Sequence, residues 1–340
     1  MKLGAYIIRR LLLLIPVLLG VSIFIFTLTR IGGDPAAAYI HERMNEEQIA
    51  HVYEKYHLNE PIHIQYWYWL DGILHGDWGY SKTARAPVTT AIAQYFPATF
   101  ELTLISILIA VSVGIALGTI SAVKRDKPVD HATRIMALSG VSLPIFWLGL
   151  MLQYVFFYKL RWFPAGGRYD EILYLQQGSI HKYTGFWTID TLLNGNLTLF
   201  GDALLHLALP AITLSFGTIA IITRIMRSSM LEVLGQEYIK TARSKGLPEK
   251  IVINRHARKN ALIPTTTVVG LSFGGLLGGA VLTETIFSWP GMGRWSTDAI
   301  LMNDWASILG FVLVTAIVYV IANLIVDVLY AFLDPRVRLG

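Results

Sequence analysis

Long apolar runs separated by polar segments dominate the chain, and they predict an all-α membrane protein. A helix that crosses about 30 Å of hydrocarbon needs about 20 apolar residues. Windows of that length lie at 11–29 and at about 98–122, 135–159, 203–223, 262–286 and 306–332. Pro16, Pro144 and Pro210 fall inside three of them. Because neighbouring helices in a membrane bundle can satisfy the carbonyl groups that proline frees, we expect six membrane-spanning helices.

The polar segment 30–97 predicts a small folded unit. Asn45 followed by two glutamates is typical of a helix N-terminus, and apolar and aromatic side chains then recur at helical spacing from Ile49 to Tyr56. Pro61 can begin a second helix rich in Tyr and Trp, which favour the headgroup level of a membrane. The segment is therefore either a surface for a partner outside the membrane or an interfacial cap on the bundle.

Composition agrees with a membrane protein. Hydrophobic residues make up 54% of the 340 residues and charged residues only 15%, whereas soluble domains have about 25% charged residues. Without cysteine the chain has no disulfide, no thiolate nucleophile and no cysteine-ligated metal. A net charge of +5 is too small to indicate a nucleic-acid partner.

The distribution of Lys and Arg predicts the orientation in the membrane. If the N-terminus is cytoplasmic, 18 of the 28 basic residues fall in cytoplasmic segments, as the positive-inside rule expects. Six spans then place both termini in the cytoplasm, the loop 160–202 outside and the loop 224–261 inside. The first window resembles a signal peptide, but its apolar run is longer than the about 7–15 residues of such a segment, so we expect it to be retained.

No motif for catalysis or metal binding is visible. The phosphate-binding pattern G-x-x-x-x-G-K-[ST], the zinc pattern H-E-x-x-H and the serine-hydrolase pattern G-x-S-x-G are all absent. The nine histidines are scattered. We therefore expect no catalytic residue, no metal site and no cofactor on this chain.

Charged and polar side chains are rare inside the predicted spans. Glu101 stands at the start of the second window, where we interpret it as a helix-end residue. Glu284 stands near the outer end of the fifth window and is expected at the interface. Asn323 and Asp327 are four residues apart in the sixth window, and we expect them to face the bundle interior.

The fifth window is rich in glycine at a spacing of four residues. This spacing relates Gly270, Gly274 and Gly278 to one another, and Gly275 to Gly279. Small residues at such intervals allow helix backbones to approach closely. The contact can lie within one bundle or against a second copy or a paralogue.

The loop 224–261 is strongly basic and has helical patterning. Tyr238, Ala242 and Lys245 recur at helical spacing, Gly246 can end that helix, and Pro248 can begin another. We expect two short helices, at about 231–246 and 248–260, that form a compact knob. Orientation and contact with anionic lipid explain its charge, whereas docking of a soluble partner also explains its ordered pattern.

This loop resembles the coupling loop of ABC importer permeases. TARSKGL (241–247) and HARKNALIP (256–264) follow the family signature, commonly E-A-A, three residues, Gly, nine residues and I-x-L-P. Of the E-A-A triplet only Ala242 is kept, whereas Gly246 falls at the expected place. His256-Ala257-Arg258-Lys259 stands in place of I-x-L-P. That departure is similar to the dipeptide/oligopeptide branch, whose members carry H-A-x-x-N-A-L-I-P.

Further segments resemble the same branch in the same order along nearly the whole chain. GDWGYS (76–81) is similar to its B-type subunit. The other similar segments are FPATFELTLIS (96–106), SLPIFWLGL (142–150), LPAITLSF (209–216), FSWPGMGRW (287–295) and LDPRVR (333–338).

The resemblance implies the type I ABC importer permease fold in a prokaryotic cell membrane. Residues 1–97 would be a first helix with an outer segment, and 98–335 the five-helix core. Expected partners are the lipid bilayer, a homologous second permease subunit, two ABC ATPase subunits that carry ATP and Mg, and an extracytoplasmic solute-binding protein. The expected substrates are di- and oligopeptides, with oligosaccharides, glutathione or nickel chelates as alternatives.

The resemblance also implies two groups of site residues. Coupling to the ATPase would involve Glu237, Tyr238, Thr241, Ala242, Lys245, Gly246, Leu247, His256, Asn260 and Pro264. An outer turn would contact the binding protein or the substrate through Trp289, Pro290, Gly291, Gly293 and Arg294. The alternative for this turn is a tight interfacial structure anchored by Trp289 and Trp295.

Two other classes of function remain as alternatives. A stand-alone secondary transporter or channel would move solute without ATPase partners and would place ionisable residues along its pathway. An intramembrane enzyme would need a cluster of catalytic side chains, which the sequence does not show.

Overall fold

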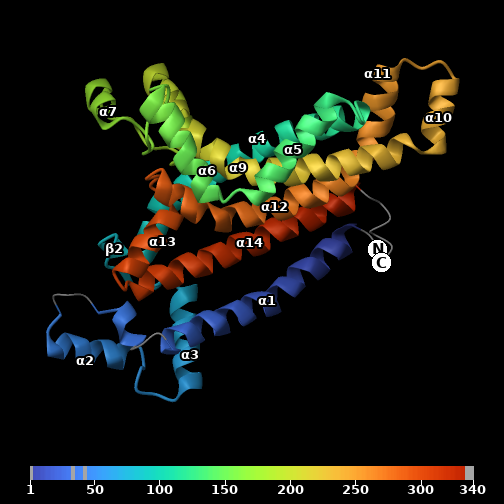
Figure 1. Cartoon of the computed structure of the whole chain (residues 1–340). Coiled ribbons are helices and arrows are strands. Elements are labelled where there is room, and N and C mark those ends of the chain that lie inside the picture. The colour runs from blue at the N-terminus through green and yellow to red at the C-terminus, as the bar shows by residue number, and fades with distance from the viewer. Residues whose placement is uncertain (1–2, 32–34, 41–43, 334–340) are drawn as a thin grey trace.

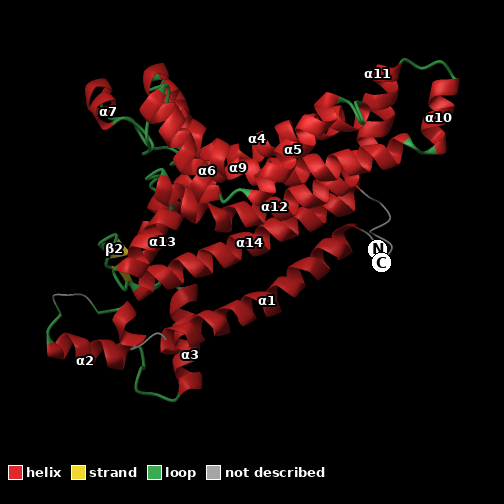
Figure 2. Ribbon diagram, in the orientation of Figure 1, coloured by secondary structure: helices red, strands yellow, loops and turns green. Residues whose placement is uncertain are grey.

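The structure, a computed structural model, describes residues 3–31, 35–40 and 44–333. Helices make up most of this part of the chain, and its strands form one short antiparallel pair (Figure 2). Four helices are long and apolar enough to cross a membrane, or up to six if each of two bent helix pairs is one span. The helical membrane fold is therefore confirmed, with four to six candidate spans in the described residues.

The long helices form the bundle. The unbroken ones are α1 (Leu3–Ile31), α4 (Val88–Val123), α9 (Leu197–Leu234) and α14 (Trp305–Leu333). The bent pairs are α5 (Pro128–Ser142) with α6 (Ile145–Leu152), and the two parts of α12 (Arg258–Ile286) together with the turns that precede it.

Both central helices are longer than the sequence predicted. α4 begins at Val88 rather than near 98, and α9 has 38 residues and runs eleven residues beyond the predicted end at about 223. Hydropathy marks only the part of a helix that lies in hydrocarbon. The backbone continues in helical form until Pro87 and Gly235, which flank α4 and α9 respectively.

The third predicted span is broken rather than continuous. α5 ends at Ser142, α6 begins at Ile145, and the two parts are bent by 110°. Leu143 is extended, with φ −79° and ψ 133°, the conformation favoured by a residue before proline. Pro144 therefore breaks this span, contrary to our expectation, whereas Pro16 and Pro210 lie inside helices. After α6 the chain continues as a π-helical segment, η2 (Gln153–Lys159).

Glycines bring α4 and α9 into close contact. A Cβ atom at position 118 would lie 2.7 Å from Met226 Cβ and 2.7 Å from the carbonyl oxygen of Thr223. A Cβ atom at position 114 would lie 2.7 Å from Ile222 Cγ2. Only glycine permits this approach without displacing α9. The contact of Gly114 and Gly118 with α9, which we call the glycine seam, therefore fixes the distance between the two helices.

The segment between α1 and α4 folds largely as predicted. Asn45 caps α2 (Glu46–Lys55) and forms a reciprocal capping box with Gln48, while Pro61 precedes α3 (Ile62–Leu74). The segment also contains η1 (Pro35–Ala38) and the hairpin of β1 (Tyr80–Ser81) and β2 (Ala86–Pro87), which the sequence did not predict. The Ser22 hydroxyl of α1 and the Tyr66 hydroxyl of α3 are 2.7 Å apart, which ties the segment to the bundle.

Short helices cover the two ends of the bundle (Figure 1). One end carries α10 (Glu237–Ser244) and α11 (Glu249–Ile251). From here on, the hairpin means these two helices with the turn between them, and we call this end of the bundle the hairpin end. The opposite end carries α2, α3, α7 (Glu171–Gln177), α8 (Trp187–Leu193) and α13 (Met292–Leu301). α1 begins and α14 ends toward the hairpin end.

The glycine seam generates a stability prediction. Replacing Gly118 with Val should lower the free energy of unfolding by about 1–3 kcal/mol, because the new side chain has to displace the backbone and Met226 on α9. The measurement is the thermal unfolding midpoint of the purified protein in detergent. Gly20→Val is the matched control, since none of the described atoms outside its own helix backbone lies within 4 Å of its Cβ position in α1. Equal unfolding midpoints for the two variants would contradict a contribution of the α4–α9 contact to stability.

Candidate functional site

The basic loop combines the extended ends of two long helices with two short helices between them. α9 continues to Leu234, a turn leads into the eight-residue helix α10, and Gly246 and Pro248 follow. The chain then passes through α11 and the π-helical segment η3 (Val252–Ala257) directly into α12. The predicted helices at 231–246 and 248–260 are therefore wrong in their bounds. The fourth apolar window ended at about 223, where the hydrocarbon is expected to end, whereas α9 stays helical to Leu234.

α10 packs on the ends of α9 and α12 through two side chains. Ile239 and Ala242 are 0% and 8% exposed and join a cluster with Met226, Met230 and Val252. These two residues are three apart and so share one helix face. Tyr238, Ala242 and Lys245 recur at helical spacing, but only Ala242 belongs to the packed face. Tyr238 and Lys245 are exposed, and Ala242 is an internal packing residue.

The turn after α10 confirms Gly246 as the residue that ends the helix. Its φ is +73°, and its N–H donates to the Arg243 carbonyl at 2.9 Å. The Leu247 N–H reaches the Ala242 carbonyl at 3.4 Å, so the two bonds form a Schellman motif. The Arg243 guanidinium donates to both carboxylate oxygens of Glu249 at 2.6 and 3.1 Å across the turn. The hydrogen bonds to Glu249 raise the pKa of Arg243.

The other predicted coupling residues hold the hairpin together or lie on its surface. Asn260 Nδ2 donates to the Tyr238 hydroxyl at 2.8 Å and to the His256 carbonyl at 3.0 Å, which joins α10 to the start of α12. Glu237 pairs with Lys240 at 2.7 Å on the exposed side of α10. Every residue from 243 to 251 is exposed, including the apolar Leu247 and Ile251.

Two more of the predicted residues lie in regular helix. Thr241 Oγ1 donates to the Glu237 carbonyl at 3.1 Å within α10. Pro264 lies inside α12 rather than at its start.

Glu101 is a buried anchor at the opposite end, not a helix-end residue. α4 begins 13 residues earlier, at Val88, so Glu101 lies well inside the helix and is 4% exposed. It pairs with Arg168 at 2.5 Å and accepts hydrogen bonds from the backbone N–H and hydroxyl of Thr188 at 2.8 and 2.6 Å. The loop 160–202 is thereby fastened to α4.

Glu284 is likewise buried rather than interfacial. Its side chain accepts hydrogen bonds from the Thr99 hydroxyl at 2.6 Å and from the Arg294 backbone N–H at 3.0 Å. A Cβ atom at position 293 would lie 2.6 Å from the Cα of Val281, so glycine is required there. The turn between α12 and α13 is folded around this carboxyl group.

The tryptophans of this turn are buried. Trp289 is 1% exposed and donates its indole N–H to the Ala98 carbonyl at 2.9 Å, and Trp295 is 2% exposed. This is the geometry of a tight, anchored turn. Gly291 is buried as well, while Pro290 and Arg294 keep part of their surface exposed. Contact of the turn with a partner stays a prediction that rests on those two side chains.

Of the two glycines of α12 whose surroundings are described, Gly274 lies close to another helix and Gly275 does not. A Cβ atom at Gly274 would lie 2.9 Å from the Tyr319 ring of α14, whereas none of the described atoms lies within 4 Å of the Cβ position at Gly275. Gly270 is partly buried. The packing of Gly278 and Gly279 lies outside the described part of the structure, as does the side chain of Asp327, while Asn323 is partly buried.

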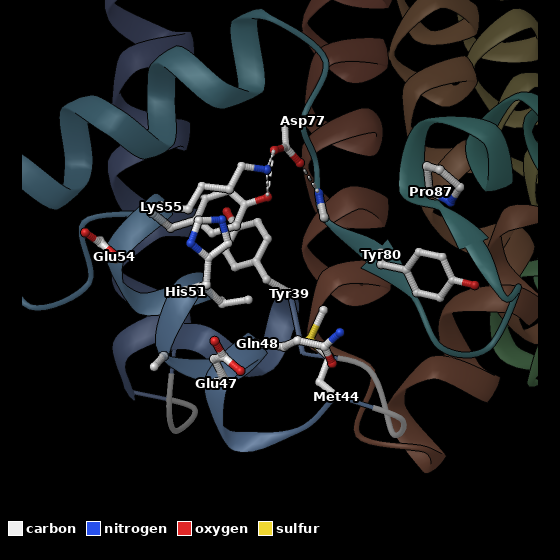
Figure 3. A pocket seen from close by; sticks show the side chains of 14 residues that line it. Tyr39, Met44, Glu47, Gln48, His51, Glu54, Lys55, Asp77, Tyr80 and Pro87 are labelled. Atoms are coloured by element: carbon white, nitrogen blue, oxygen red, sulfur yellow. Dashed lines mark hydrogen bonds and ion pairs between the residues drawn. The ribbon is translucent and has the colours of Figure 1, made fainter.

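A cavity of about 1020 Å³ lies in the segment between α1 and α4 (Figure 3). The rings of Tyr39 and Tyr56 stack 3.7 Å apart beside it, and the Tyr56 hydroxyl donates to Asp77 at 2.8 Å. Burial raises the pKa of Tyr39, and burial together with Asp77 raises that of Tyr56. Both rings therefore remain neutral phenols at physiological pH.

Sequence reasoning missed a buried ion pair near the hairpin end. Arg227 of α9 donates to both carboxylate oxygens of Asp130 in α5, each at 2.7 Å, and the Ser121 hydroxyl of α4 donates to the same carboxylate. The partners are 97 residues apart, and no local pattern connects them. Among the described residues, no group of three or more His, Cys, Asp or Glu side chains could hold a metal ion.

Comparison with known proteins covers nearly the whole chain. Residues 114–339 match the family described as binding-protein-dependent transport system inner membrane component, and residues 3–103 match the N-terminal region of such components. The chain is 44% identical to the dipeptide transport system permease protein DppB of Alkalihalophilus pseudofirmus over 335 residues, which cover 98% of this chain and 99% of that protein.

Two further relatives also align with this chain over nearly its whole length. The dipeptide transport system permease protein DppB of Escherichia coli K12 is 42% identical over 98% of each chain. The oligopeptide transport system permease protein AppB of Bacillus subtilis is 36% identical over 98% of this chain and 99% of its own. Because the family match exceeds half of the chain and these alignments span it almost completely, this chain belongs to the family of binding-protein-dependent transport system inner membrane components.

Proposed function

We propose that this chain is one of two permease subunits of an ATP-driven importer that takes di- and oligopeptides into a prokaryotic cell. The support is similarity over 98% of the chain to permeases named for dipeptide and oligopeptide transport. The chain itself would be the membrane component, and ATP hydrolysis would occur on separate ATPase subunits.

The proposed topology has six spans with both termini in the cytoplasm. It counts each bent helix pair as one span. α1 begins and α14 ends toward the hairpin end of the bundle, an arrangement that an even number of spans requires (Figure 1). The hairpin end carries the larger share of Lys and Arg, as cytoplasmic segments do. On this topology α2, α3, α7 and α13 lie outside.

The coupling function rests on one observation: an exposed, well-ordered turn stands on the ends of two membrane helices. Ile239 and Ala242 fix α10 against α9 and α12, and the turn presents Leu247 and Ile251 to solvent. A cleft of an ATPase subunit would receive this turn. When ATP binding brings the two ATPase subunits together, α9 and α12 would move with the hairpin as one rigid body.

The opposite end would receive the peptide from an extracytoplasmic solute-binding protein. Pro290 and Arg294 are the proposed contacts of the outer turn, since Trp289, Gly291 and Gly293 are buried. The second permease subunit would pack against surfaces that this chain leaves open, such as Gly275 of α12. Residues 1–97 would be an added unit, and residues 98–335 the transport core.

Transport by the reconstituted assembly tests the function directly. Liposomes that contain both permease subunits and the ATPases should take up labelled dipeptide only with ATP inside and binding protein outside. Uptake by this chain alone would instead indicate a stand-alone transporter or channel. Uptake of oligosaccharide, glutathione or nickel chelate in place of peptide by the complete assembly would keep the machinery and change the substrate class.

Gly246 provides a test of the hairpin. Gly246→Val should separate ATP hydrolysis from peptide uptake, because a β-branched residue at φ +73° is strained by about 1–2 kcal/mol. Gly246→Asn is the matched control, since asparagine tolerates this conformation. Hydrolysis and uptake are measured together in liposomes. If the Val variant takes up as much peptide per ATP hydrolysed as the wild type, the proposed role of the hairpin in coupling is contradicted.

Exposed and buried positions of the hairpin should behave differently. Leu247→Asp should leave the thermal midpoint unchanged, because the side chain is on the surface. It should weaken retention of the ATPase subunits during purification by about tenfold, if Leu247 is an anchor of the contact. Ala242→Arg should instead lower the midpoint, because the new side chain cannot fit among Met226, Met230 and Val252. Unchanged ATPase retention in Leu247→Asp would reject the proposed docking face.

A further inference from the structure

A second cavity, about 380 Å³ in volume, lies between α4, α5 and α9. Its lining is divided into two parts. Hydroxyl and guanidinium groups line one part, and the apolar side chains of Ala137, Leu138 and Val141 on α5 line the other. Ser121 near the end of α4 and Thr133 near the start of α5 place its polar part close to the loop that joins these helices.

The polar part of the cavity has an excess of positive charge. Arg227 is neutralised by Asp130, to which it makes two hydrogen bonds. Arg134 and Arg224 also line the cavity, are exposed, and form no ion pair or hydrogen bond with the residues that the structure describes. Two guanidinium groups thus face one cavity without an acid from the described chain.

A buried hydroxyl group in the same cavity also lacks a partner. Thr223 is 1% exposed, and its Oγ1 has no hydrogen-bond partner among the described atoms. Leaving such a group unsatisfied costs about 1–3 kcal/mol. An oxygen-bearing ligand in the cavity would accept a hydrogen bond from this hydroxyl group.

The apolar part shows which kind of ligand fits. Arg134, Leu138 and Val141 are spaced by four and three residues, so they lie on one face of α5. Leu138 and Val141 are 70% and 56% exposed. Arg134 is nearer to the start of α5, at the end of the bundle, and the apolar side chains follow toward the middle of the membrane. A ligand with an anionic head and a long apolar tail matches this order.

We propose that this cavity binds one anionic phospholipid of the membrane leaflet at the hairpin end. Arg134 and Arg224 hold the phosphate, since guanidinium groups bind phosphate oxygens through paired hydrogen bonds. The Thr223 hydroxyl donates to a headgroup or ester oxygen, and an acyl chain lies along Leu138 and Val141. Basic cavities between membrane helices on the cytoplasmic side are suited to such headgroups.

The position of the lipid relates it to transport. Arg227, which lines the cavity, joins α9 to α5 through Asp130, and α9 carries α10 at its end. A lipid between α5 and α9 stabilises the contact on which the hairpin stands. Transport by the assembly therefore depends on anionic lipid, independently of the peptide that is carried.

Lipid retention tests the proposal. The complete purified assembly is loaded with phosphatidylglycerol, and the lipid that stays bound is counted by native mass spectrometry. Arg134→Gln combined with Arg224→Gln should reduce retention by about tenfold, because charge-assisted hydrogen bonds to phosphate are lost. Thr223→Val, which keeps the shape and charge of the site, should reduce it by a smaller factor. Lys127→Gln is the control, since Lys127 precedes α5 at the same end but does not line the cavity.

Uptake in liposomes gives an independent readout. Peptide uptake by the unaltered assembly should rise as phosphatidylglycerol replaces phosphatidylcholine, and uptake by the double arginine variant should not respond. Equal retention in the double variant and the wild type would overturn the proposal, as would an equal loss in Lys127→Gln. Loss of the second permease subunit with lipid retention unchanged would identify a subunit interface instead. A raised KM for peptide with lipid retention unchanged would identify a site for the peptide carboxylate and would also overturn it.

Discussion

Close contact between α4 and α9 is the constraint on which the rest of the structure depends. Without a hydrophobic force between helices in lipid, association relies on tight packing and hydrogen bonds. Gly114 and Gly118 supply the packing by letting α9 approach the backbone of α4. α9 is the most buried of the candidate spans, and its C-terminal extension carries both Arg227 and the connection to α10. A change in the α4–α9 distance would therefore reach the hairpin.

Buried carboxyl groups fix the two ends of this helix pair. Glu101 and Glu284 attach the loop 160–202 and the turn before α13 to the bundle at one end, and Asp130 joins α4, α5 and α9 at the other. A buried charge without partners is strongly destabilising, so each group is useful only when its hydrogen bonds are made. All three accept several, and together they specify where irregular segments meet regular helices.

Sequence patterns predicted the parts of the fold that depend on local chemistry. The cap at Asn45, the helix start after Pro61 and the break at Gly246 follow from the preferences of single residues, and the structure has all three. Helix bounds were predicted less well, because hydropathy reports the hydrocarbon and not the extent of the hydrogen-bonded backbone.

Features that depend on tertiary contacts could not be read from local sequence. Glu101 was interpreted as a helix-end residue and Glu284 as an interfacial one, because their partners Thr188 and Thr99 are 87 and 185 residues away along the chain. Helical spacing placed Ala242 with Tyr238, whereas its burial is decided by Met226 and Val252 on other helices. Motif similarity singled out the loop 224–261, but only the three-dimensional packing separates its structural residues from its exposed ones.

That separation bears on how a force on the hairpin is transmitted. α10 has only eight residues and would be a marginal helix alone. Its buried face contacts α9 through Met226 and Met230, and it contacts η3, which leads directly into α12, through Val252. A force on the turn would therefore act on two long helices at once. The Tyr238–Asn260 hydrogen bond and the Arg243–Glu249 pair limit bending within the hairpin. Because the hairpin is held by its own hydrogen bonds and packs on both helices, the proposed docking of an ATPase subunit would move it together with α9 and α12.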